Sequence, residues 1–330
     1  MKRTFFTLML LGLGLGATAQ ELQTLREYLE AGLERNYDIR IIRNEERISD
    51  NNATAANAGK LPTIDLSAGY TGRLDNDRTT PRGGDPVTEN GIYNQTFDVG
   101  LAVNWTLFDG FRIRAEYAKL EELKAKGALQ TRLTIEDFIA SFTAEYYNFV
   151  QQKLRLGNYL YAMALSRERL RIAEEWYRVG SSARLDVLQA RVDFNADSSQ
   201  YMSQQEAVTA SRIRLNELLA NEELDRKLNV RDSLIAIDAD LEWERLMAQT
   251  RETNASLLLA DRDNTISELE LESIRSRNYP YLKLQAGYGY THNRYGGGAN
   301  RSNGTLGLNA GVQVGFTIFD GNRRRVKYSF

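Results

Sequence analysis

Side chains able to carry out chemistry are few and widely spaced in this 330-residue chain. It contains one histidine, His292, and no cysteine, which excludes thiol nucleophiles and zinc sites of the usual kind. The sequence has neither an HExxH motif nor a glycine-rich phosphate loop, and its carboxylates are spread along predicted helix faces as solvated charges. We therefore expect no enzymatic activity, no metal and no cofactor, with His292 in a solvated loop.

Composition and the N-terminus narrow the class of protein. The formal net charge is −2 with 26% charged residues, whereas a nucleic-acid binder would usually carry a basic surplus. Met1-Lys2-Arg3, an apolar run from Phe5 to Leu15 and Ala17-Thr18-Ala19 are typical of a cleaved secretory signal over 1–19. The run is shorter than the roughly 20 residues of a membrane-spanning helix, and no other long apolar run occurs. We expect an exported protein that binds no nucleic acid and has no transmembrane helix.

An internal repeat sets the expected architecture. Residues 99–110 are echoed by residues 310–321, and both stretches end in Phe-Asp-Gly. Farther upstream, 61–70 matches 279–288, so each copy reads as helix, strand, loop, strand; Asn36 likewise has a counterpart in Asn254. We predict a first structural repeat over 20–220, a connecting segment over 221–240 and a second repeat over 241–330.

Four segments alternate apolar and polar residues, which indicates strands with one face of each kind. They are 61–73, 96–108, 280–291 and 306–319, and the intervening segments 74–95 and 291–305 are predicted to be solvent-exposed turns. The polar faces are rich in Gly, Asn, Gln and Thr, which suits a water-filled lumen. The expected lumen-facing positions are Asp65, Ser67, Asp98, Asn104, Thr106, Lys283, Gln285, Asn309, Gln313 and Thr317.

Two architectures fit this alternation: a soluble sheet packed on helices, and a membrane β-barrel. The strand lengths match the 9–11 residues of a tilted transmembrane strand, and aromatic residues near the strand ends resemble interfacial girdles. These features favour the barrel. Four strands cannot close one, and open edges do not occur in lipid. Eight strands leave an interior just filled by side chains, so a channel predicts at least three chains.

The segment after Phe108-Asp109-Gly110 is predicted to be a long helical hairpin over 111–220. No proline and only two glycines occur between 111 and 178, and apolar residues recur at spacings of three and four. At about 1.5 Å per residue such a helix is roughly 100 Å long, which suggests coiled-coil packing. A turn at 179–182 and a second helix over 183–220 complete the hairpin.

The turn and its flanks resemble the helical-hairpin tip of the TolC family of outer-membrane efflux proteins. The similarity rests on Tyr177–Ala190 (YRVGSSARLDVLQA), on the paired strands ending in Phe-Asp-Gly and on Asn-Tyr-Asp-Ile at 36–39. The resemblance implies an α+β membrane protein with long antiparallel coiled-coil hairpins, whose four strands per chain contribute to a trimeric 12-stranded barrel in the outer membrane. It also implies a helical tunnel in the periplasm of a Gram-negative bacterium.

The family resemblance further implies a passive exit duct of a tripartite efflux pump or type I secretion system. The implied partners are two further copies of the chain, a periplasmic adaptor (membrane fusion) protein, an inner-membrane transporter and outer-membrane lipid. Adaptor contact is carried over to Val179, Gly180 and Ser181, and more weakly to Leu185 and Asp186. A structural explanation also fits two of them, because Gly180 can end a helix with positive φ and Asp186 suits a helix's first turn.

The second repeat departs from the family pattern, because only nine residues follow Gly321. A second helical hairpin, and with it the family's gating carboxylates, is not found, which predicts that the sequence is a fragment. Two other functions remain open: a stand-alone outer-membrane diffusion porin, and a soluble periplasmic coiled-coil scaffold. The sequence identifies neither the exported substrate nor the cognate pump.

Overall fold

The computed structural model describes residues 23–231, 242–298 and 300–327. The predicted signal over 1–19, residues 232–240 of the predicted connecting segment and residue 241 of the predicted second repeat lie outside these ranges. The chain forms two compact units, each built from separate stretches of sequence. The first combines Met1–Ile41 with Thr134–Glu242, and the second combines Ile42–Leu133 with Trp243–Phe330.

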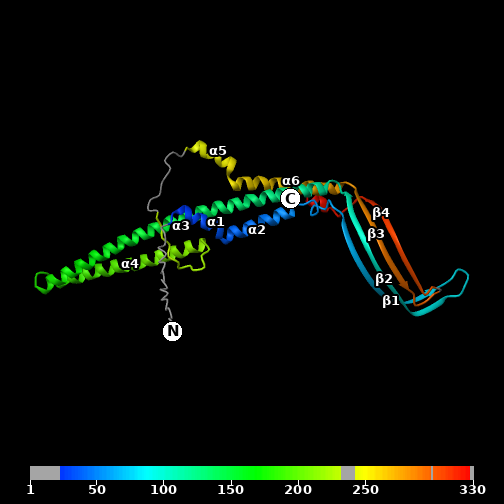
Figure 1. Cartoon of the computed structure of the whole chain (residues 1–330), viewed down its shortest axis with the longest axis horizontal. Coiled ribbons are helices and arrows are strands. Elements are labelled where there is room, and N and C mark those ends of the chain that lie inside the picture. Colours follow the sequence, from blue (N-terminus) through cyan, green and yellow to red (C-terminus); the bar gives the residue numbers. More distant parts are fainter. Residues whose placement is uncertain (1–22, 232–241, 299, 328–330) are drawn as a thin grey trace, which may run out of the picture. The chain divides into compact units, whose positions relative to one another are not determined.

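The second unit contains one antiparallel sheet of four strands in the order β1-β2-β3-β4 (Figure 1). The strands are β1 (Thr63–Thr79), β2 (Val87–Phe108), β3 (Tyr281–Arg294) and β4 (Ser302–Gly315). Both turns lie at one end of the sheet, whereas its connections to helices lie at the other. The predicted combination of a four-stranded antiparallel sheet and long helices is confirmed.

The strand ends differ from those predicted. The segment predicted as a loop over 74–95 is mostly strand, because β1 and β2 stay paired up to Thr79 and Val87. His292 lies within β3, opposite Phe97 and Gly304, and not in a loop. Polar residues such as Asp and Asn are depleted in strands, yet here the hairpin ladder continues through them because each backbone group finds its cross-strand partner.

Helices of the second unit follow the ends of the strands. The unit contains most of α2 (Tyr37–Asn52) and the beginning of α3 (Arg112–Arg178). It also contains α5 (Trp243–Thr253), α6 (Ala255–Arg275), the 3-10 turn η1 (Ser276–Asn278) and α7 (Arg323–Lys327). None of the helices that the structure describes is long and apolar enough to cross a membrane.

Ion pairs join α6 to the beginning of α3. Lys119 pairs with Glu270 at 2.7 Å, and Arg262 pairs with Glu122 at 2.8 Å. Arg132 donates to the carbonyl oxygen of Thr253 at 2.8 Å, beside the N-terminus of α6. Since these groups are partly exposed, each ion pair contributes about 0–1 kcal/mol and orients the helices more than it stabilises them.

The two Phe-Asp-Gly motifs change the chain's direction in the same way. After the first motif, Gly110 and Phe111 have φ of 71° and 73°; after the second, Gly321 and Asn322 have φ of 68° and 62°. A helix begins at the next residue in both places, α3 at Arg112 and α7 at Arg323. Two successive left-handed residues are uncommon in L-amino-acid chains, so their recurrence marks equivalent turns.

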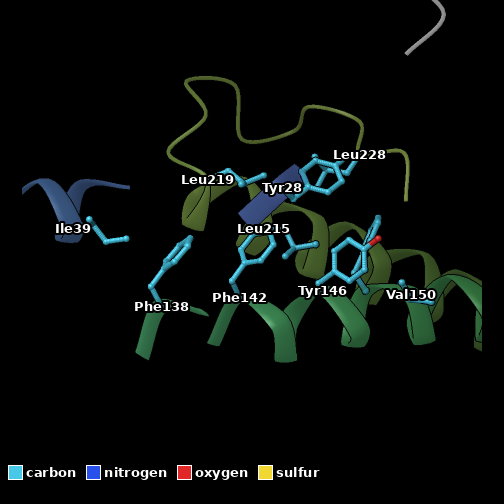
Figure 2. Close-up of a cluster of buried hydrophobic side chains, with 10 residues drawn as sticks. Tyr28, Ile39, Phe138, Phe142, Tyr146, Val150, Leu215, Leu219 and Leu228 are labelled. Atoms are coloured by element: carbon cyan, nitrogen blue, oxygen red, sulfur yellow. The ribbon is translucent and has the colours of Figure 1, made fainter. Parts of the chain in front are cut away.

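The first unit is organised by the antiparallel helices α3 and α4 (Arg184–Leu218), against which α1 (Leu25–Arg35) packs (Figure 1). The core of this unit contains aromatic residues that recur every three or four positions along α3. Figure 2 shows that they contact residues of α1 and α4. Phe138 and Phe142 lie 5.7 Å apart between ring centroids, and Tyr28 lies 6.1 Å from Tyr146. Burial raises the pKa of the Tyr28 hydroxyl above its ordinary value.

Two buried asparagines hold the helix ends of this core. The Asn36 side chain donates to the carbonyl oxygen of Leu218 at 2.9 Å and accepts from the amide of Ile39 at 3.2 Å. It therefore pairs with a free amide at the start of α2 and with a free carbonyl group at the end of α4. Asn216, which is fully buried, donates to the carbonyl oxygens of Leu224 and Arg226 and fixes the loop after α4.

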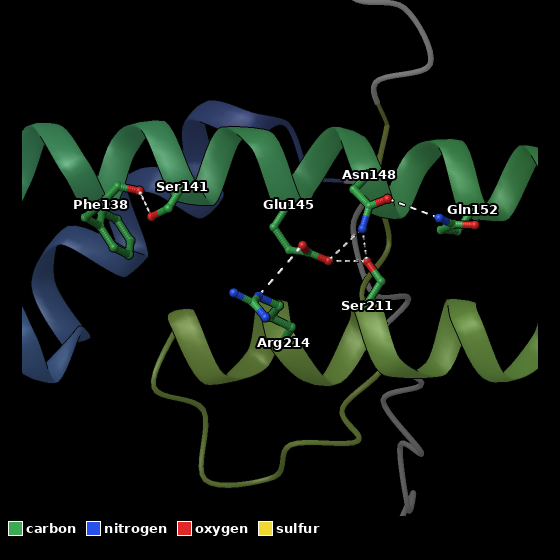
Figure 3. Close-up of polar contacts among 7 residues, drawn as sticks. All are labelled: Phe138, Ser141, Glu145, Asn148, Gln152, Ser211 and Arg214. Atoms are coloured by element: carbon green, nitrogen blue, oxygen red, sulfur yellow. Dashed lines mark hydrogen bonds and ion pairs between the residues drawn. The ribbon is translucent and has the colours of Figure 1, made fainter.

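A polar layer interrupts the contact between α3 and α4 (Figure 3). Glu145 accepts from the Ser211 hydroxyl and, at 3.1 Å, from the side-chain NH2 group of Asn148. Arg214 lies 3.9 Å from the other carboxylate oxygen. Because a buried polar group is costly without its partner, this layer favours one alignment of the two helices over alternatives shifted along their axes.

The turn that connects β2 to α3 yields a stability prediction. A Cβ on Gly110 would lie 2.2 Å from the carbonyl oxygen of Ser276, so Gly110→Ala adds a backbone clash to the strain of its positive φ. We expect a loss of about 2–5 kcal/mol in the free energy of unfolding. Gly321→Ala is the matched control, since its φ is similar and no atom lies within 4 Å; about 1–2 kcal/mol is expected there. Urea unfolding followed by circular dichroism measures both, and equal losses would contradict the prediction.

Candidate functional site

The sheet has a continuous polar face. Directly opposite residues of antiparallel strands place their side chains on the same face, and the pairing runs through all four strands. One row across the sheet contains Thr63, Asn104 and Gln285; the next contains Asp65 and Asn309. Nine of the ten predicted lumen-facing residues share this face: Asp65, Ser67, Asp98, Asn104, Thr106, Lys283, Gln285, Asn309 and Gln313.

One row of the polar face has almost no side chains. Ser67 pairs with Gly100, Gly100 with Gly289, and Gly289 with Gly307. A Cβ on Gly289 would lie 3.0 Å from the carbonyl oxygen of Val99, so the backbone approaches closely there. Alternation along each strand predicts the individual lumen-facing positions. A row across four strands also depends on the register in which the strands pair, and the sequence alone does not give that register.

Thr317, the remaining predicted lumen-facing residue, lies beyond the paired part of β4 and lines a pocket together with Thr106 and Lys283 of the polar face. The ladder between β3 and β4 ends at the pair Tyr281 and Gly315, so Phe316, Thr317 and Ile318 lie beyond the strand that was expected to reach residue 319. The residue that would oppose Phe316 is Pro280, which has no amide hydrogen to donate. The alternation therefore continues in the sequence after the pairing has stopped.

The opposite face of the sheet is apolar and uncovered. Its rows include Leu66, Leu101, Tyr288 and Leu308, and Leu66 and Leu308 are 74% and 76% exposed. No residue of the four strands is buried. A soluble sheet packed on helices would bury one face, so the structure argues against that alternative. Such a large apolar surface requires an apolar environment outside this chain.

Aromatic side chains mark both ends of the apolar face. Tyr70 and Phe97 form a pair towards the turns, and Trp105 lies at the end nearest the helices. His292 shares the row of Tyr70 and Phe97, stacked 6.3 Å from Tyr290 between ring centroids. Beyond this row the same face is mixed, with Gln95 opposite Arg294 and, one row farther, Leu74 opposite Tyr93. Residues 87–95 show no regular alternation of apolar and polar residues, so no local signal in the sequence indicates this extension of the strands.

The hairpin tip ends α3 with a Schellman motif. The amide of Ser181 donates to the carbonyl oxygen of Trp176 at 2.9 Å, and the amide of Gly180 donates to that of Tyr177 at 3.0 Å. Gly180 supplies the left-handed residue with φ of 79°, as this motif requires. The predicted structural role of Gly180 follows directly from this geometry.

The start of α4 completes the tip. Asp186 accepts from the amide of Ala183 at 3.1 Å, which satisfies one free amide of the first turn. Val179 and Leu185 are 74% and 72% exposed, so neither is needed for packing within the chain. The structure thus brings the five predicted tip residues together on one short, solvent-exposed turn.

The described part of the chain contains no group of His, Cys, Asp and Glu able to hold a metal ion. What the structure presents instead is a sheet with one polar and one apolar face, neither of them buried, joined to long paired helices. A sheet with one polar and one apolar face is the pattern of strands in outer-membrane β-barrel proteins. The particular family follows from the sequence: the family model "outer membrane efflux protein" matches residues 28–221, more than half of the chain. The chain belongs to the outer membrane efflux protein family, as its resemblance to TolC predicted.

Solved channels share the fold. The CmeC outer membrane channel of Campylobacter jejuni superposes with a TM-score of 0.75 at 16% identity, over 92% of this chain and 64% of CmeC. VceC of Vibrio cholerae gives 0.69 at 15% identity, over 92% of this chain and 71% of VceC. A membrane protein from Pseudomonas aeruginosa gives 0.73 at 15% identity, over 92% and 69%. No curated protein matched the sequence. The chain spans about two thirds of the length of these channels.

The tip geometry yields a second prediction. Gly180→Ala places a side chain at positive φ in otherwise open space, and we expect it to lower the free energy of unfolding by about 1–2 kcal/mol. Gly157→Ala is the matched control in the middle of α3, also in open space; there alanine should stabilise by about 0.5–1 kcal/mol. Urea unfolding of the helical circular-dichroism signal measures both. Effects of the same sign would refute the tip assignment.

Proposed function

We propose that this chain is one protomer of a trimeric exit duct that carries substrates across the outer membrane and the periplasm. The observation that carries the proposal is the sheet, in which register separates polar from apolar side chains across four strands and leaves both edges open. Three chains would supply twelve strands. Eight strands leave an interior just filled by side chains, so twelve leave an aqueous opening.

The positions of the turns and helices support an orientation. Both β-turns lie at one end of the sheet, whereas α3 and α6 connect at the other. We place the turns at the cell exterior and the helices in the periplasm. The polar face would line the lumen and the apolar face would meet lipid. No step requires chemistry, which agrees with a family and fold that are those of channels.

The exposed tip is the proposed docking point for a periplasmic adaptor protein, which would couple the duct to an inner-membrane transporter. Val179 and Leu185 support this role because they are apolar, exposed and without a packing function in the chain. Gly180, Ser181 and Asp186 build the turn that presents them. An adaptor ending in an apolar helical surface would bury these side chains on docking.

We also propose that the chain carries two copies of one unit, over 20–220 and 241–330. Asn36 and Asn254 support this, because each accepts from the backbone amide three residues later. The paired left-handed residues after each Phe-Asp-Gly support it independently.

The orientation of the sheet can be tested by cysteine labelling, because the chain has no native cysteine. Ser67→Cys and Asn104→Cys should react with a membrane-impermeant maleimide after reconstitution into liposomes, since the lumen is aqueous. Leu66→Cys and Val103→Cys are the neighbouring controls and should stay unlabelled in lipid. Conductance recording on the same liposomes should show pores. Labelling of all four positions would overturn the lipid assignment, and a chain that stays in the aqueous fraction without forming pores would favour the scaffold.

Adaptor docking requires a different test. Val179→Glu and Leu185→Glu should reduce export in cells by more than tenfold, because burying an unpaired charge at an interface costs several kcal/mol. Tyr161→Glu, at an exposed position on the flank of α3, is the matched control and should export normally. Conductance of all three reconstituted variants should equal that of the unmodified chain. Normal export by both tip variants would contradict docking at the tip and favour a stand-alone porin.

A further inference from the structure

A pocket lies where the sheet meets the helices. It has a volume of about 440 Å³ and is bounded by the loop before β1, the end of β2 and the first turns of α3. The side chains that matter are Lys60, Trp105, Leu107, Phe111, Arg114 and Tyr117. They divide into an apolar floor, which extends the apolar face of the sheet, and a cationic rim, which has no role in the duct or the tip described above.

The floor continues the apolar face of the sheet. Trp105 belongs to that face, and its indole nitrogen donates to the carbonyl oxygen of Lys60 at 3.0 Å, which fixes the ring. Phe111 packs edge-on against Phe108 with ring centroids 5.2 Å apart, yet remains 57% exposed. A hydrocarbon chain that lies along the apolar face of the sheet could therefore extend into the pocket without passing polar side chains.

The rim carries positive charge that the described part of the chain does not neutralise. Within the described ranges, neither Lys60 nor Arg114 forms an ion pair, whereas nearby cations of α3 do: Arg112 pairs with Asp109 at 3.0 Å and Lys119 pairs with Glu270. Asp109 also lines the pocket, but Arg112 offsets its charge. The two unpaired cations thus give the rim a net positive charge at neutral pH.

We propose that this pocket binds an anionic phospholipid, with its phosphate between Lys60 and Arg114 and its acyl region against Trp105 and Phe111. The inference rests on the proposed function, which places the helical end of the sheet at the periplasmic leaflet. Amphipathic aromatics and basic residues are the groups that meet lipid headgroups at this depth. A phospholipid matches both halves: its phosphate complements the unpaired cations, and its acyl chain continues the apolar floor.

Trp105 provides a local reporter. Trp176→Phe and Trp243→Phe, both at exposed positions, leave it as the single tryptophan of the full-length chain. The chain is reconstituted in phosphatidylcholine vesicles containing a fixed fraction of spin-labelled lipid, either phosphatidylglycerol or phosphatidylcholine, labelled near the glycerol. We expect a preference for phosphatidylglycerol of about fivefold for each cation, seen as stronger quenching of Trp105.

Three variants make the assignment specific. Lys60→Gln with Arg114→Gln should bring the quenching ratio close to one. Lys60→Arg with Arg114→Lys should keep the preference, because the charges remain. Arg78→Gln with Arg82→Gln removes two cations near the other end of the sheet and should leave the ratio unchanged. Equal quenching by both lipids in the unmodified chain would overturn the proposal, as would loss of the preference in millimolar inorganic phosphate, which indicates a free-anion site.

A second reporter separates failure of this inference from failure of the proposed function. Leu101→Trp, combined with Trp105→Phe in the same background, places the tryptophan in the middle of the apolar face. Quenching of this reporter by lipid labelled deep in the acyl chain, with no quenching of Trp105 by either headgroup-proximal label, would mean that another copy of the chain covers the pocket. Absence of quenching at both positions would instead refute the membrane location itself.

Discussion

The two open edges of the sheet are the constraint on which the rest of this structure depends. Within the residues that the structure describes, β1 and β4 each have one side without a strand partner, and both faces of the sheet are uncovered. In lipid an unpaired backbone amide or carbonyl costs several kcal/mol, so the edges must pair with other strands. In the proposed trimer, closure through further copies would satisfy the edges, give the apolar face an apolar surrounding and enclose the polar face. The same requirement therefore explains both the two unlike faces of the sheet and its open edges.

The helical hairpin meets a different requirement, because long helices in water can slide along one another. Its aromatic core supplies burial through Phe138, Phe142 and Tyr146, but ring stacks repeat at each turn and tolerate a shift. The Glu145–Ser211 hydrogen bond and the Asn36 contacts at the helix ends do not tolerate it, since a shifted alignment would leave buried polar groups unsatisfied. Apolar burial therefore stabilises the hairpin, and the polar groups determine its alignment.

Periodicity predicted most of this fold because it reports which side of an element is buried. The spacing of Phe138, Phe142 and Tyr146 predicted the core face of α3, and alternation predicted the two faces of each strand. The ends of the strands were harder to predict, because strand pairing depends on a partner that is distant in sequence. Residues 74–79 look like a loop by composition but pair with β2, whereas residues 316–319 alternate like a strand but lie beyond the last cross-strand pair, Tyr281 and Gly315. The pocket beside Trp105 joins segments about 45 residues apart (Lys60 and Trp105), and no local pattern signals it.

The row formed by Ser67, Gly100, Gly289 and Gly307 has a consequence for traffic through a closed ring. At that level each chain would present one hydroxymethyl group and three bare backbones, so the bore is wider there than at the rows above and below. Such a wall offers few side chains to which a solute could adhere, and water solvates the exposed peptide groups instead. The proposed duct would therefore bind solutes weakly at this level and select little among them by chemistry. Selection of cargo would then depend on the partner that loads it.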